Sequence, residues 1–109
     1  MRTEKPCNLR EILDMIKRNP YLFFGVKSLD SIFFFISGYY LRAELENSEY
    51  TDCLDGFEEF VHSHYEDMST RNWHGLIVHE TRTQEDAVDR FFELIEMFFG
   101  LTERDNGSR

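Results

Sequence analysis

Apolar residues recur at helical spacing near the start of the chain. Four of them follow one another at i, i+3, i+4 and i+7: Leu9, Ile12, Leu13 and Ile16. This periodicity predicts an amphipathic helix over about residues 9–18. Asn8 stands at its N-cap position and Glu11 follows three residues later, which is the spacing of a capping box. Asn19 and Pro20 end the helix, because the residue before a proline avoids the helical region.

Residues 20–27 form a connector with too many large apolar side chains to be a free loop. Exposing such side chains to water is unfavourable, so we expect Tyr21, Leu22 and Phe23 to fold back over the first helix. Gly25 is expected to provide a backbone turn that a side chain would hinder.

Ser28 is placed to cap a second helix, over about residues 29–45. One face of this helix is apolar: Leu29, Ile32, Phe33, Ile36, Tyr39 and Tyr40. Phe34 and Phe35 widen the apolar surface beyond a stripe, which is typical of a helix covered on more than one side. Gly38 is unfavourable in a helix by up to ~1 kcal/mol relative to alanine. We therefore expect another helix to pack closely against Gly38.

A third helix is predicted over about residues 53–65, with Thr51 or Asp52 as its cap. Its inward face is apolar except for one histidine: Leu54, Phe57, Phe60, Val61 and His64. The opposite face carries acidic residues and His62. The buried face and the charged face are therefore two sides of one helix.

The segment Trp73–Glu80 is open to two interpretations. The run of residues 76–78 suits a strand, but the chain has no second strand-like run, and a lone strand leaves its backbone groups unsatisfied. We therefore predict a short helix. Trp73, the one tryptophan of the chain, either closes the core or forms an exposed anchor for a partner.

The last helix has the clearest pattern. Thr83 and Asp86 have the spacing of a capping box. The apolar positions that follow suit one long helix: Ala87, Val88, Phe91, Leu94, Ile95, Phe98 and Phe99. Gly100 is expected to end it. The resulting fold class is all-α, a single-domain bundle of four to five helices over residues 1–109, with residues 1–7 and 102–109 frayed.

The charges of the chain are unevenly distributed. Its net charge is −9, and residues 43–67 hold no Lys or Arg but nine acids: Glu44, Glu46, Glu49, Asp52, Asp55, Glu58, Glu59, Glu66 and Asp67. In the rest of the chain twelve acids face twelve bases. A concentrated negative surface argues against a nucleic-acid partner. It is either a solvated face that keeps the protein soluble or a docking surface for a basic partner.

Nothing in the sequence predicts secretion or membrane insertion. The first residues are polar, and the most apolar run, residues 32–36, is far shorter than the ~20 residues that span a bilayer. We therefore expect a soluble protein of the cytoplasm. Cys7 and Cys53 fit this expectation as two reduced thiols, because one isolated pair is no disulfide framework.

Candidate chemistry is sparse. Four histidines are present, His62, His64, His74 and His79, but none has the i, i+4 spacing that chelates a metal on a helix. Cys7 precedes a predicted helix, where a thiolate would be stabilised, but the sequence places no general base near it. The abundant carboxylates lie on a face that is predicted to be solvated, whereas catalytic acid–base pairs need a desolvated pocket. We therefore predict no catalytic residue, no metal and no cofactor.

Several short runs along the chain share a pattern: Ile16-Lys17-Arg18-Asn19-Pro20, Phe24-Gly25, Lys27-Ser28-Leu29, Phe35-Ile36, Gly38-Tyr39, Trp73, Ala87 and Phe91-Phe92-Glu93-Leu94. Together they resemble a group of small bacterial immunity proteins of polymorphic toxin systems, including contact-dependent growth inhibition. The chain departs from the pattern at Asn19, where the group prefers arginine, and at Phe24, where it prefers leucine. The resemblance implies a toxin inhibitor. It implies no binding residue, because immunity interfaces vary with the cognate toxin.

The leading hypothesis is therefore an immunity protein that binds and neutralises a cognate toxin, a nuclease with a basic surface. The contact candidates lie in the acidic segment: Glu46, Glu49, Asp52, Asp55, Glu58, Glu59 and His62. One alternative is a metal-dependent enzyme or sensor that uses the histidines. Another is an oligomeric adaptor protein, a homodimer for example, that buries Phe34 and Phe35 between subunits.

Overall fold

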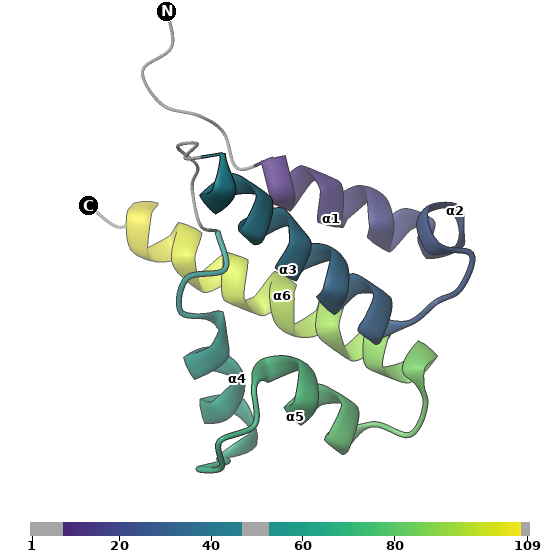
Figure 1. Cartoon of the computed structure of the whole chain (residues 1–109). Coiled ribbons are helices and arrows are strands. Elements are labelled where there is room, and N and C mark those ends of the chain that lie inside the picture. The colour runs from purple at the N-terminus through teal and green to yellow at the C-terminus, as the bar shows by residue number, and fades with distance from the viewer. Residues whose placement is uncertain (1–7, 47–52, 108–109) are drawn as a thin grey trace, which may run out of the picture. The chain divides into compact units, whose positions relative to one another are not determined.

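The computed structural model describes residues 8–46 and 53–107, and within these ranges every regular element is an α-helix. In chain order the helices are α1 (Asn8–Arg18), α2 (Pro20–Phe24), α3 (Leu29–Leu45), α4 (Phe57–Tyr65), α5 (Trp73–Glu80) and α6 (Gln84–Gly107) (Figure 1). The all-α prediction is confirmed. The predicted count of four to five helices is too low, because the described residues contain six.

The helices fall into two compact units. One unit ends at Asp55 and the other begins at Gly56. The single-domain organisation therefore stays a prediction. None of the described helices is long and apolar enough to cross a membrane.

The first unit begins with α1, which buries the stripe that the sequence predicts. Leu9, Leu13 and Ile16 are at most 1% exposed. Lys17 and Arg18 lie in the last turn, where cations complement the helix dipole. The predicted end of this helix at Arg18 is confirmed.

The second helix, α2, was predicted as a connector. Pro20 occupies the first helical position and the Asn19 side chain accepts a hydrogen bond from the backbone N–H of Leu22, at 3.3 Å. Gly25 ends the helix with φ 76°, and its N–H bonds the carbonyl of Tyr21. The predicted turn at Gly25 is confirmed, since positive φ favours glycine.

The predicted burial of the α2 side chains is wrong. Although α2 packs on α1, Tyr21 is 55%, Leu22 76% and Phe23 42% exposed. A five-residue helix turns its side chains to all sides, so one packed face cannot cover three consecutive residues.

The bounds of α3 agree with the prediction. Ser28 caps it by accepting a hydrogen bond from the N–H of Ser31, at 3.3 Å. Leu29, Ile32 and Ile36 are buried, and Phe35 is half-buried against Phe24 of α2 and Tyr39, with ring centroids 6.2 and 6.5 Å away. The expected neighbour of Gly38 is absent from the described residues: a Cβ placed there would meet nothing within 4 Å.

In the second unit, α4, α5 and α6 pack on one another. Phe57 of α4 is the central side chain, because its ring makes edge contacts with Trp73, Phe91 and Phe98 at centroid distances of 5.4–5.9 Å. Trp73 stacks on Phe91 at 5.1 Å and is 9% exposed. Of the two interpretations of Trp73, the structure supports a residue of the core and not an exposed anchor.

The helix bounds in this unit differ from the prediction at two places. Helix α4 begins at Phe57, after Gly56 with φ 89°, and the proposed caps Thr51 and Asp52 lie outside the described residues. Helix α6 continues past Gly100 to Gly107, so the predicted end at Gly100 is wrong. The predicted helix at Trp73–Glu80 is confirmed as α5, and so is the Thr83 cap, whose hydroxyl oxygen accepts from the N–H of Asp86 at 3.0 Å.

Candidate functional site

The acidic candidate residues differ in whether a nearby basic side chain compensates their negative charge. Glu46 follows the last turn of α3, and its carboxylate accepts a 2.8 Å hydrogen bond from Nε of Arg42. Its negative charge is therefore partly compensated within its own helix. Asp55 is exposed and makes no ion pair within the described part of the chain. Glu49 and Asp52 lie outside the described residues.

The first turn of α4 carries two exposed carboxylates side by side, Glu58 and Glu59. Neither forms an ion pair with a described residue. Phe57 and Val61 on the same helix are fully buried, so α4 has the predicted two-sided character. Carboxylates in a first turn interact favourably with the helix dipole, and Gly56 at the N-cap supplies no side chain for this purpose.

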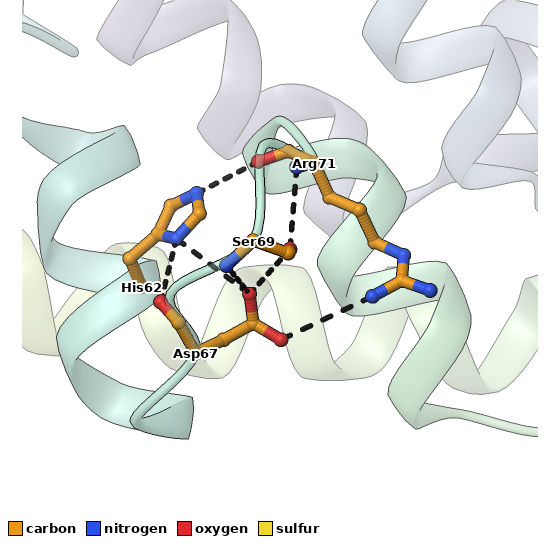
Figure 2. A network of polar contacts seen from close by, with 4 residues as sticks. All are labelled: His62, Asp67, Ser69 and Arg71. Atoms are coloured by element: carbon orange, nitrogen blue, oxygen red, sulfur yellow. Dashed lines mark hydrogen bonds and ion pairs between the residues drawn. The ribbon is translucent and has the colours of Figure 1, made fainter.

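His62, the last of the sequence candidates, is bound inside the protein. Figure 2 shows its imidazole between two backbone carbonyls of the segment that joins α4 and α5. Nδ1 lies 2.9 Å from the carbonyl oxygen of Asp67, and Nε2 lies 2.7 Å from that of Arg71. The ring therefore holds both ends of the α4–α5 connection and has neither nitrogen left for a partner.

The geometry favours the protonated form of His62. A carbonyl oxygen only accepts hydrogen bonds, so both contacts can be hydrogen bonds only when both ring nitrogens carry a proton, as in the imidazolium cation. The two carbonyl contacts, with help from the nearby carboxylates of Asp67 and Glu58, raise the pKa of His62 above its ordinary value of 6.5. Nδ1 lies 3.9 Å from Oδ1 of Asp67.

Asp67 organises the rest of this connection. Its Oδ1 accepts a 2.7 Å hydrogen bond from the N–H of Ser69 and a second bond from the Ser69 hydroxyl. Its Oδ2 lies 4.0 Å from Nη1 of Arg71. The hydrogen bonds from Ser69, and then the positive charges of Arg71 and His62, lower the pKa of the Asp67 carboxyl. We call His62, Asp67, Ser69 and Arg71 the His62 network.

Glu66 joins the His62 network to α4 in a strained conformation. Its φ and ψ are 52° and 44°, a left-handed region that costs a non-glycine residue about 1 kcal/mol. The N–H of Glu66 bonds the carbonyl of Ser63, and the N–H of Asp67 bonds that of His62. This is the Schellman pattern, which usually has glycine at this position. The Glu66 side chain is exposed beyond the end of α4.

Sequence reasoning included Glu66 and Asp67 in the acidic segment but assigned neither a role. The pair Asp67 and Ser69 has the spacing of an Asx turn, in which the carboxylate accepts from the backbone two residues later. That signal was available in the sequence. The contact of His62 with Arg71 spans nine residues of irregular backbone, and no periodicity predicts it.

The remaining histidines belong to no metal-binding cluster of described residues. His64, predicted to face inward, is exposed, and its ring lies against those of Phe60 and Tyr65. It shares a face with the buried Phe57 and Val61, but it lies in the last turn of α4, where this face is no longer covered. Across residues 8–46 and 53–107, no three His, Cys, Asp or Glu side chains are grouped closely enough to hold a metal ion. Cys7 lies outside these ranges.

A polar pocket of about 340 Å³ lies where α5 joins α6, and it is open to solvent. Four acids and two arginines line it together with Thr81: Glu80, Arg82, Asp86, Asp89, Arg90 and Glu93. Arg90 donates to the Tyr65 hydroxyl at 3.0 Å and to Glu93 at 3.1 Å, and the Tyr65 bond raises the pKa of Arg90. Mixed charges of this kind give the pocket no strong preference for one class of ligand.

No family model, curated protein or solved structure matches the chain. The resemblance to immunity proteins is therefore a hypothesis that rests on the residues quoted above.

Proposed function

We propose that this chain is an immunity protein that binds and neutralises a cognate bacterial toxin in the cytoplasm. The observation that carries the proposal is the pair of exposed carboxylates on α4. Neither Glu58 nor Glu59 lies within ion-pair distance of a described basic side chain, although the charge of Glu58 acts on the nearby His62. Both project from a helix whose opposite face is anchored by Phe57 and Val61. A basic partner can therefore bind these two carboxylates without breaking an ion pair.

The chemistry of the partner follows from the charge. Nuclease domains carry basic surfaces that bind phosphates, and clustered carboxylates on an inhibitor can occupy the same surface. Long-range attraction between the two proteins then accelerates their encounter. Because the Debye length falls from ~10 Å at 0.1 M salt to ~3 Å at 1 M, this binding weakens as salt is added.

The candidate residues take different roles in this proposal. Glu58 and Glu59 make the main contacts, with Asp55 before them and Glu66 after them. Glu46 contributes less, since Arg42 already compensates its charge. His62 keeps the α4–α5 connection in place and so positions Glu66. Glu49 and Asp52 are included among the proposed contact residues because of their positions in the acidic segment of the sequence.

The proposal is tested by reversing the two charges on α4. The toxin domain encoded by the gene immediately upstream is expressed in a bacterial host with either the wild-type chain or the variant E58K/E59K. The wild-type chain is expected to restore growth and to bind the purified toxin domain. The variant should bind about 100-fold more weakly, about 1.4 kcal/mol for each reversed charge, because each lysine now faces a basic surface.

A matched control separates this effect from net charge. Glu11 and Glu85 also lie in the first turns of their helices, so E11K/E85K makes the same change in net charge and in helix-dipole energy away from α4. This control should protect as well as the wild type. Equal protection by E58K/E59K, with both variants folded by circular dichroism, would show that the acidic face serves solubility only.

A further inference from the structure

The contacts of His62 join helix α4 to the start of α5. The ring belongs to the last turn of α4, and its Nε2 lies 2.7 Å from the carbonyl oxygen of Arg71, the residue before the Asn72 cap of α5. Its Nδ1 lies 2.9 Å from the carbonyl oxygen of Asp67, at the other end of the same connection (Figure 2). Each contact is a hydrogen bond only while its nitrogen carries a proton. Loss of one proton must therefore break one of the two contacts.

The two ends of the connection differ in how they are held without the ring. Asp67 stays tied to α4, because its N–H donates to the carbonyl oxygen of His62 at 3.0 Å. Arg71 is held more loosely. Its N–H donates to the Ser69 hydroxyl at 3.3 Å, and its guanidinium lies 4.0 Å from the Asp67 carboxylate. Neither of these two contacts reaches α4.

The Asp67 carboxylate favours one nitrogen as the site that keeps the proton. Its Oδ1 lies 3.9 Å from Nδ1. If Nδ1 lost its proton, its lone pair would face the Asp67 carbonyl oxygen and lie near this carboxylate, in a contact that is partly shielded from water. The Nε2 contact is exposed, so a water molecule can bridge an unprotonated Nε2 and the Arg71 carbonyl. The neutral ring therefore favours Nδ1–H, although the Nε2 contact is the shorter of the two.

The other charges around the ring do not oppose this preference. Glu58 lies one turn before His62 on α4, and its negative charge stabilises the cation as a whole. The side chain of Arg71 faces the Asp67 carboxylate. Helices α5 and α6 contact α4 through aromatic side chains packed around Phe57. The charges that act on His62 therefore come from α4 and from the connection.

We propose that His62 is a pH-dependent switch that ties the start of α5 to α4 when protonated and releases it when neutral. In the protonated state both ends of the connection are bound to the ring. In the neutral state Nδ1–H keeps the Asp67 end, while the Arg71 carbonyl leaves the ring and binds water. The switch is closed at low pH and opens as the pH rises through the titration of His62. It operates in the free chain and requires no toxin.

Nuclear magnetic resonance of the isotope-labelled full chain tests this switch. The ring nitrogen shifts of His62 give its protonation at each pH and the position of the proton in the neutral ring. Nδ1–H should exceed Nε2–H about 10-fold, because the other form leaves a hydrogen bond unmade in the partly shielded contact. The carbonyl carbon shift of Arg71 should follow the titration of the ring, and that of Asp67 should change less.

A charge-removing variant tests the role of the Asp67 carboxylate. D67N keeps an oxygen that can accept from the N–H of Ser69, so the connection retains its turn. The variant should reduce the ratio of Nδ1–H to Nε2–H at least about 2-fold and lower the pKa of His62. The control E85Q makes the same change in charge at an exposed position in the first turn of α6, and it should leave both values unchanged.

Four results would overturn the proposal. The first is a neutral ring that carries its proton on Nε2, and the second is an Arg71 carbonyl shift that stays constant while His62 titrates. The third is a His62 that titrates at the same pH as His79, which lies exposed on α5. The fourth is an equal change of the proton ratio in D67N and E85Q, since the Asp67 carboxylate would then select neither nitrogen.

Discussion

At the scale of single residues, His62 has the most constrained chemistry of the described chain. Two backbone carbonyls face its two ring nitrogens at 2.9 and 2.7 Å, and only the protonated ring satisfies both. A neutral ring would turn one lone pair toward a carbonyl oxygen, which is repulsive. The contacts at the α4–α5 connection therefore favour the cationic form of His62, inside the most acidic part of the sequence.

This arrangement predicts a pH dependence of stability. The folded-state pKa of His62 is raised above 6.5, so its stabilising contribution is complete below that value and is lost as the pH rises through the folded-state pKa. The free energy of unfolding should therefore fall as the pH rises above about 6.5 and through the folded-state pKa. Urea unfolding followed by circular dichroism measures it.

The charged neighbours of His62 do not produce the same fall in the free energy of unfolding. The carboxyl pKa of Asp67 is lowered from 3.8, so its own contribution is lost only as the pH falls through that lower value, far from this window. H62Q should remove most of the fall, whereas the control H79Q, at an exposed position of α5, should keep it. An unchanged fall in H62Q would refute the imidazolium assignment.

At the scale of helices, three helices that begin at a side-chain cap, α3, α5 and α6, were predicted from the sequence, whereas α2, capped by Asn19, was predicted as a connector. Ser28, Asn72 and Thr83 each accept a hydrogen bond from the N–H three residues later. The signal is strong because it satisfies backbone donors that a helix start leaves open. Helix α4 begins instead after a glycine with positive φ, and sequence reasoning placed its start too early.

Gly100 shows why the end of a helix is harder to predict. A glycine costs a helix about 1 kcal/mol, and Phe98 and Phe99 just before it are buried, so packing holds the backbone helical through this position. The His62 network was missed for a related reason. It joins residues across an irregular connection, where geometry rather than periodicity brings the groups together.

Gly38 offers a prediction at this scale. It lies inside α3 with helical backbone and open space around its Cα, so G38A should stabilise the monomer by about 0.5–1 kcal/mol. Thermal or urea unfolding at low protein concentration measures this gain.

At the scale of the whole molecule, the excess negative charge affects two kinds of association in opposite ways. Added salt should weaken binding to a basic toxin, because it screens attraction. It should strengthen pairing of two copies, because it screens repulsion. The sign of the salt effect therefore distinguishes binding to a basic partner from association of two copies of the chain. The acidic segment could be predicted from the sequence composition. The structure was needed to show that Glu58 is exposed and that Arg42 compensates the charge of Glu46.

The position of Trp73 has a practical consequence for the organisation of the chain. It is the one tryptophan of the sequence, and it stacks on Phe91 in the unit that begins at Gly56. Its fluorescence therefore reports the unfolding of that unit alone, whereas circular dichroism reports the helices of both units. If the chain is a single cooperative domain, the two urea curves will coincide. Separate midpoints would show that the half without a tryptophan unfolds on its own.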